Sequence, residues 1–112
     1  MISAPISDLQ KVKPREVFPG FFGRFIHTET MTFAYWEIVK GSTVPIHSHM
    51  HEQVVNMLEG KFELIIDGNP TVLSPGMVAA IPSHSVHSGT ALTSCKILDV
   101  FFPVREDYKE LT

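Results

Sequence analysis

The sequence predicts an all-β domain, built as a barrel or a sandwich. Short runs rich in aromatic and β-branched residues recur along the chain, and turns containing Gly or Pro separate them. No segment sustains the 3.6-residue apolar repeat of an amphipathic helix. Many short strands with frequent turns are typical of sandwiches and barrels, in which one face of each strand is buried against another sheet.

The expected strands can be placed in order from these patterns. We expect them at residues 22–27, 31–39, 44–49, 53–58, 61–67, 71–73 and 77–81, in a short segment at His87, and at 93–102. The run at 31–39 is apolar on both faces, which suits a strand that is covered on both sides. Residues 61–67 alternate between apolar and polar side chains, as in a strand with one buried face.

Turn signals connect these strands. Lys40-Gly41-Ser42 indicates a turn, and Asp67-Gly68 is a strong signal for a tight hairpin. We expect a further turn near residues 50–52, which would fold residues 44–58 into a hairpin. Residues 105–111 have room for one terminal helical turn.

Length and proline content suggest the domain organisation. The 112 residues are enough for one domain with one hydrophobic core. We expect an extended N-terminal arm over residues 1–20, where Pro5, Pro14 and Pro19 stand among polar residues. The arm has room for one short edge strand. Residues 21–112 should form the single domain.

Charge and cysteine content exclude several classes of protein. The net charge is −3 and the pI is near 6.0, which argues against a nucleic-acid partner or an anionic membrane surface. No apolar run is long enough to span a bilayer, and residues 1–14 do not resemble a signal peptide. The single cysteine, Cys95, cannot form an internal disulfide. We therefore expect a cytoplasmic protein without a membrane partner.

Residues 41–60 contain three of the six histidines at alternate positions. Side chains two residues apart on a strand point to the same face, so His47 and His49 can present their rings to one point. His51 and Gln53 share that parity, and a turn would bring one of them opposite the pair. Neutral imidazole is the commonest metal ligand, so this segment predicts a site for a divalent transition metal.

The last expected strand places a carboxylate on an apolar face. One face presents Cys95, Ile97, Asp99 and Phe101. Because burial of Lys96 is costly, the opposite face should reach solvent or a subunit boundary, which turns Asp99 inward toward the expected metal cavity. A buried carboxylate needs a partner or a chemical role, and its pKa should be perturbed. The structural alternative is a bond to the backbone or a pair with Arg24 or Arg105.

Arg105 follows this strand and offers a second functional candidate. A guanidinium suits bidentate capture of a carboxylate. The alternative is a surface arginine in a solvated run with Glu106 and Asp107. Trp36 fits a core position better than a ligand platform, and Cys95 fits a small core residue.

The histidine segment and a segment downstream resemble the two motifs of the cupin family. The first motif comprises Gly41, His47, His49, Gln53 and Gly60, with Gln where cupins usually carry Glu. The second comprises Gly76, Pro82 and His87, with His84 in place of the usual second Gly and Ala91 in place of the usual Asn. The resemblance implies a double-stranded β-helix, or jelly roll. It also implies a metal bound by His47, His49, Gln53 and His87.

This implied ligand set has a chemical consequence. Three neutral imidazoles and a neutral amide leave the 2+ charge of the ion uncompensated, so the metal should be a strong Lewis acid that favours an anionic ligand. Ni, Zn, Mn, Fe and Cu all accept such ligands, and the identity of the metal stays open. His51 is the alternative to Gln53, although its place in the turn favours a position outside the ligand set.

Two stretches, residues 47–53 and 99–108, are also similar to the KdgF subfamily of small single-domain cupins, which act in pectin degradation. The resemblance implies linearisation of 4,5-unsaturated monouronates from pectin or alginate. It further implies a small anionic sugar-acid substrate, a homodimer, and active-site roles for Asp99, Phe101 and Arg105. Other activities remain open, namely a metal-dependent dioxygenase or a non-catalytic cupin that binds a small molecule.

Overall fold

The structure is a computed structural model that describes residues 5–111 of the chain. The strands are β1 (Arg15–Phe18), β2 (Phe21–His27), β3 (Thr32–Ile38), β4 (Thr43–His47), β5 (Glu52–Glu59), β6 (Phe62–Ile66), β7 (Asn69–Leu73), β8 (Val78–Ile81), β9 (His87–Ala91) and β10 (Cys95–Phe102). A 3-10 helix, η1 (Leu9–Lys11), precedes β1, and a short helix, α1 (Glu106–Lys109), follows β10. Within the described residues, no helix has the length and apolar character needed to cross a membrane.

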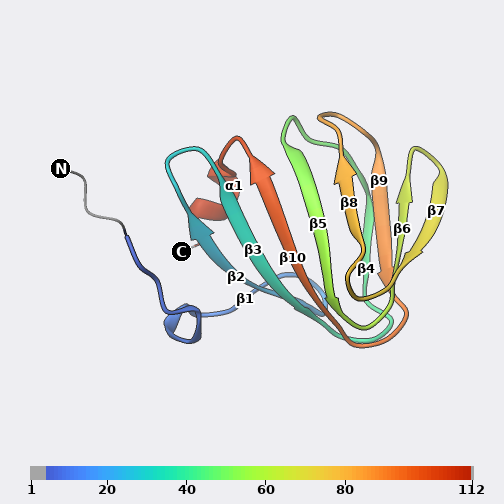
Figure 1. The fold of residues 1–112 in the computed structure, drawn as a ribbon, viewed down its shortest axis with the longest axis horizontal. Helices are drawn as coiled ribbons and strands as arrows, with labels where there is room; N and C mark the ends of the chain where they lie inside the picture. Colours follow the sequence, from blue (N-terminus) through green and yellow to red (C-terminus); the bar gives the residue numbers. More distant parts are fainter. Residues whose placement is uncertain (1–4, 112) are drawn as a thin grey trace.

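The strands form two antiparallel sheets with the core between them (Figure 1). One sheet has six strands in the order β1-β2-β3-β10-β5-β8, and the other has four in the order β4-β9-β6-β7. This arrangement confirms the predicted all-β jelly-roll sandwich. The edge strand for which the N-terminal arm had room is β1, which pairs with β2. The division of the chain at residue 20 stays a prediction.

The hairpin expected within residues 44–58 is wrong. β4 pairs with β9 in the four-stranded sheet, whereas β5 lies between β10 and β8 in the six-stranded sheet. Both edges of β5 are therefore occupied, so β4 cannot pair with β5. Residues 48–51 carry the chain from one sheet to the other. Strand parity reports which way a side chain points, but it does not report which strand lies alongside.

The burial predicted for the last strand is confirmed. Four inward residues of β10 are buried, namely Cys95, Ile97, Asp99 and Phe101. Lys96 and Phe102 are exposed on the other face. The inward residues meet an aromatic cluster in which Phe25, Trp36 and Tyr108 contact one another. One carboxylate, that of Asp99, is thus buried beside this aromatic cluster.

Two turns with positive φ fix the ends of the sandwich. Gly60 has φ +84°, and a Cβ there would come within 2.1 Å of the Ser94 carbonyl oxygen. No other residue fits that turn without moving the backbone. His84 also lies in the left-handed region, with φ 67°. It replaces the glycine that the second motif usually carries, and its N–H still donates to the His49 carbonyl at 2.8 Å.

Candidate metal centre

Three histidines converge where the two sheets meet. His47 ends β4, His87 begins β9, and the two are register partners across the sheet. His49 lies in the crossing segment between β4 and β5. Their candidate ligand nitrogens all lie within 4.8 Å of one another, so the three side chains could hold a metal ion. The spatial convergence predicted for these residues therefore exists, although a crossing segment produces it instead of a hairpin.

Backbone carbonyls orient each of the three rings. The Nδ1 of His47 contacts the Pro45 oxygen at 2.8 Å, and the Nδ1 of His87 contacts the Ser85 oxygen at 2.9 Å. The Nδ1 of His49 contacts a third carbonyl, that of His51, at 3.0 Å. A carbonyl oxygen only accepts, so each Nδ1 carries the proton and each Nε2 keeps its lone pair. Metal-binding histidines are commonly oriented in this way.

Two of the rings, those of His49 and His87, are held neutral as well as oriented. Burial, reinforced by the positive charges of Arg105 and His87, lowers the pKa of His49 to about 4. Burial also lowers the pKa of His87. The Nε2 atom of His87 is buried without a hydrogen-bond partner among the described residues. A buried lone pair without a donor is costly, and a metal ion would satisfy it.

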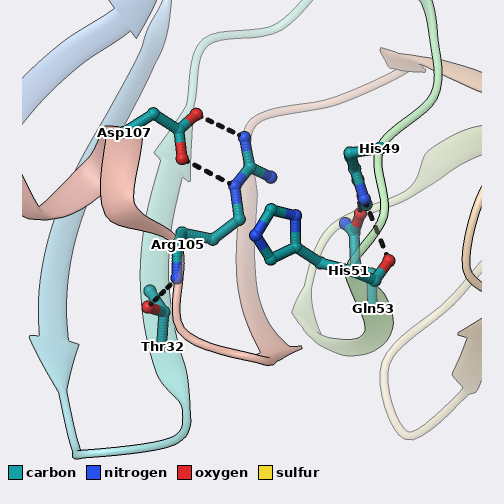
Figure 2. Close-up of polar contacts among 6 residues, drawn as sticks. All are labelled: Thr32, His49, His51, Gln53, Arg105 and Asp107. Carbon is teal, nitrogen blue, oxygen red and sulfur yellow. Dashed lines mark hydrogen bonds and ion pairs between the residues drawn. The ribbon is translucent and has the colours of Figure 1, made fainter.

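Gln53, at the start of β5, lies beside this cluster. Its Oε1 lies 3.1 Å from the Nε2 of His49 (Figure 2). Since both atoms carry lone pairs, either the amide is turned so that its NH₂ donates, or a cation lies between them. Neighbouring ligands at bond lengths of about 2.1 Å stand roughly 3.0 Å apart around an octahedral ion. The observed separation fits that geometry, so the donor set suits a divalent transition metal.

The remaining histidine of the segment, His51, lies outside this group. The described histidines that converge are His47, His49 and His87 alone. The His51 ring lies between the Arg105 side chain and the pair formed by His49 and Gln53 (Figure 2). Burial lowers the pKa of His51, with Arg105 acting in the same direction.

A small cavity of about 60 Å³ adjoins the cluster. Its polar lining includes His47, Gln53, His87, Asp99 and Arg105. These five predicted site residues, from four separate strands and one loop, therefore line a single cavity, whereas His49 is not among the described residues that line it. Phe101, which is 2% exposed, supplies part of the apolar wall.

Asp99 is buried within this lining, and its partner is one that the sequence did not reveal. The Trp36 indole Nε1–H donates to Asp99 Oδ2 at 3.0 Å. Asp99 Oδ1 is buried without a well-formed hydrogen bond. Burial raises the pKa of Asp99 to about 7, while the nearby Gln53 amide, the Trp36 indole and the Arg105 charge act in the opposite direction. Arg24, the other partner considered, instead contacts Glu37 at 3.8 Å.

Arg105 is more enclosed than a solvated surface arginine. Its side chain is 11% exposed, and its guanidinium carbon lies 4.0 Å from the Tyr108 ring centroid and 4.8 Å from that of Phe101. Nε donates to Asp107 Oδ1 at 3.0 Å and Nη2 donates to Asp107 Oδ2 at 2.7 Å (Figure 2). Arg105 thus contacts Asp107 of the charged run, but aromatic side chains cover the cation, so it is not the solvated surface arginine of the alternative.

Sequence reasoning missed two contributors to the site, Trp36 and Tyr108. Both line the cavity and both are buried, at 5% and 6% exposure. Tyr108 comes from α1, whose short length gives no periodic signal. Trp36 was assigned to the core, which is correct, but its N–H contact with a residue 63 positions away has no local signature.

Comparison with known proteins agrees with this architecture. The pectin degradation protein KdgF of Dickeya dadantii (strain 3937) is 30% identical over 71 residues, which cover 62% of this chain and 64% of that relative. The match therefore spans less than two thirds of the relative. The structure of KdgF from Halomonas sp. superposes with a TM-score of 0.88 and 26% identity, covering 95% of this chain and 99% of that chain.

A second solved structure gives the same result. An RmlC-like cupin from Shewanella frigidimarina NCIMB 400 superposes with a TM-score of 0.88 and 26% identity, covering 95% of this chain and 96% of that chain. The family model described as "Cupin domain" matches residues 34–101, a span that holds the three converging histidines and Asp99. The chain belongs to the cupin domain family.

Proposed function

We propose that this cupin opens the ring of 4,5-unsaturated monouronates, using a divalent metal bound by His47, His49, Gln53 and His87. The observation that carries the proposal is a buried carboxyl, Asp99, whose pKa is raised to about 7 on the wall of the cavity that His47 and His87 also line. Similarity to KdgF supports the substrate class, because the relative is named for pectin degradation.

The reaction is an isomerisation that needs one proton taken and one returned. An unsaturated uronate is a cyclic hemiacetal whose ring oxygen is also part of an enol ether. Loss of the hydroxyl proton at C1 lets the bond between C1 and the ring oxygen break, which gives an aldehyde and an enolate. Protonation of the enolate at C4 then gives the ketone. Every atom of the substrate is retained in the open-chain product.

Asp99 is suited to both proton transfers. A carboxyl with a pKa near the working pH exists in both protonation states, so it can accept the hydroxyl proton and later donate one to carbon. Trp36 binds Oδ2 and leaves Oδ1 for the substrate. When bound, the metal supplies Lewis acidity that polarises a substrate oxygen.

Two further residues position the substrate in this proposal. Arg105 binds the uronate carboxylate, because a guanidinium forms paired hydrogen bonds with a planar anion. Phe101 provides an apolar wall beside it. The cavity of about 60 Å³ is small compared with the roughly 300–1,000 Å³ of typical ligand pockets. We therefore expect the reacting edge of the sugar, and not the whole ring, to enter the cavity unless the cavity widens when the substrate binds.

The outer face of the six-stranded sheet supports the expected homodimer. Leu58, Val78 and Phe102 are 48%, 61% and 55% exposed on this sheet. Large apolar side chains grouped on one face favour association with another protein surface. A homodimer through this face, and a cytoplasmic location, remain predictions of the proposal.

The decisive test follows the reaction by NMR. Metal-loaded protein is incubated with unsaturated galacturonate, and the open-chain keto acid is expected to form faster than it does spontaneously. Asp99→Asn should remove the acceleration while metal content is unchanged, and Glu106→Gln, an exposed acid outside the cavity, should retain it. Oxygen uptake instead would indicate a dioxygenase. Binding of the sugar acid without conversion would indicate a binding protein.

A further inference from the structure

Asp107 occupies one particular edge of the Arg105 guanidinium. A guanidinium has five N–H donors, arranged so that two different edges can each bind a carboxylate in a bidentate manner. The contacts from Nε and Nη2 to the two Asp107 oxygens use the edge formed by Nε and Nη2. The end-on edge consists of one hydrogen of Nη1 and the second hydrogen of Nη2.

The Arg105 side chain cannot readily turn to exchange these edges. Its own backbone N–H donates to Thr32 Oγ1 at 2.9 Å, and Thr32 is fully buried in β3. The guanidinium carbon lies over two aromatic rings, those of Phe101 and Tyr108. The backbone anchor and the aromatic contacts hold the planar group in one place, while the Asp107 contacts fix its rotation within that plane.

The two members of the ion pair also lie in different environments. Arg105 lines the cavity beside His47, Gln53 and Asp99, whereas the Asp107 side chain is 59% exposed and is not among the described residues that line it. Asp107 therefore holds the cation from the side away from His49 and Gln53 (Figure 2). The end-on edge is the part of Arg105 left to meet a ligand in the cavity.

We propose that Asp107 is a positioning residue that presents the end-on edge of Arg105 to the cavity, and that this edge selects a planar carboxylate on the substrate. The inference rests on the proposed function, and it names the group that sets preference for a sugar acid over a neutral sugar. Two donors fixed in one plane match the two oxygens of a carboxylate and do not match a hydroxyl.

The test uses the metal-loaded protein and the variant Asp107→Asn. Because the pair involves a well-exposed carboxylate, its loss should leave the fold intact. We expect KM for unsaturated galacturonate to rise about tenfold, with kcat within a factor of about two, since the lost interaction orients the substrate without taking part in proton transfer. Glu106→Gln, which removes an acid from the same helix that contacts Lys109 at 3.8 Å, should leave both constants unchanged.

A second readout does not depend on turnover. Calorimetry with non-reacting galacturonate and neutral galactose should show a preference for the acid in the wild type, and this preference should fall about tenfold in Asp107→Asn. The Arg105 Nε–H signal in a ¹⁵N NMR spectrum should move in that variant and not in Glu106→Gln. If the protein prefers the acid over the neutral sugar but does not convert unsaturated galacturonate, the proposed function is refuted and the positioning role of Asp107 is not.

Three results would overturn the inference itself. One is an unchanged KM in Asp107→Asn, and another is equal affinity of the wild type for the two sugars. The third is a lower KM in the variant, which would mean that Asp107 competes with the substrate for Arg105 instead of positioning it.

Discussion

Trp36 and Asp99 are joined by a buried hydrogen bond in which the indole N–H donates to one carboxyl oxygen at 3.0 Å. The two residues lie on β3 and β10, where Asp99 is the register partner of Ala34, two residues from Trp36. The bond distinguishes the two oxygens of the carboxyl. Oδ2 is occupied, while Oδ1 is buried without a well-formed hydrogen bond. In the proposed reaction, Oδ1 is the oxygen that transfers the proton.

Trp36→Phe should raise the Asp99 pKa above its present value of about 7. The indole N–H lowers this pKa because it donates to the charged form, and phenylalanine removes the donor. One limb of the pH–rate profile, acidic or alkaline, should report the titration of Asp99. That limb should move to higher pH in the variant. The variant should also lose about 1–3 kcal/mol of stability from the unsatisfied acceptor. An unmoved limb would show that Asp99 does not control the rate.

Asp99→Asn should change how the stability of the metal-free protein depends on pH. The folded pKa of about 7 lies above the unfolded value, so between roughly pH 4 and pH 7 the folded state binds the additional proton. Stability from this group is full below about pH 4 and falls as pH rises toward 7, by roughly 4 kcal/mol in total.

The buried histidines act in the opposite direction, so the comparison must be between wild type and variant. Because burial lowers the pKa of His49 to about 4, its contribution to stability is lost as pH falls from 6.5 toward 4. Urea unfolding of both proteins at several pH values isolates the Asp99 contribution as a difference. A difference that stays constant from pH 4 to pH 8 would contradict the raised pKa.

His84→Gly should stabilise the protein slightly. His84 is exposed and has φ 67°, a conformation that costs a residue with a Cβ about 1–2 kcal/mol. Glycine removes that cost but increases the freedom of the unfolded chain, so the expected net gain is roughly 0.5–1 kcal/mol. Thermal unfolding checks the gain, and Ser85→Gly serves as the control at a neighbouring position whose φ is not positive. A loss of stability in His84→Gly would mean that the imidazole makes a contact of its own.

The sequence was sufficient for the identity and facing of most strands. Alternation along residues 95–102 correctly separated the buried face of β10 from the exposed one, because parity is a local property of extended backbone. The Asp67-Gly68 turn joins β6 and β7 as its residues indicate, with both residues at positive φ.

What could not be predicted depends on contacts between distant segments. The sequence predicts a hairpin between β4 and β5, whereas the connection crosses from one sheet to the other. A four-residue connection can form either structure, and the outcome depends on which strands occupy the two edges of β5. The bond from Trp36 to Asp99 and the placement of Tyr108 over Arg105 join residues whose positions follow from the complete fold. The convergence of His47, His49 and His87 was expected because they belong to the two sequence motifs. The spacing of residues in such a motif indicates which of them meet in the fold.

His87→Ala should abolish stoichiometric metal binding. Its Nε2 is one of the converging nitrogens, and it is buried without another partner. In the wild type, the pKa of His49, lowered to about 4, should keep this ligand available below pH 6.5, with loss as pH approaches 4 and its ring becomes protonated. The lowered pKa of His87 acts in the same direction. Metal content after dialysis at a series of pH values measures both effects. His27→Ala, outside the cluster, is the control, and equal metal content in His87→Ala would contradict the site.

Gln53→Glu should tighten metal binding and slow the reaction. A carboxylate in place of the amide compensates part of the 2+ charge, which strengthens attraction for the ion but lowers its Lewis acidity. The new charge also lies beside Asp99, whose pKa should rise because two neighbouring carboxylates resist joint ionisation. Competition with a chelator measures the affinity, and the pH–rate profile measures the shift. Equal affinity in the two proteins would show that residue 53 does not contact the metal, which would return His51 to consideration as the fourth ligand.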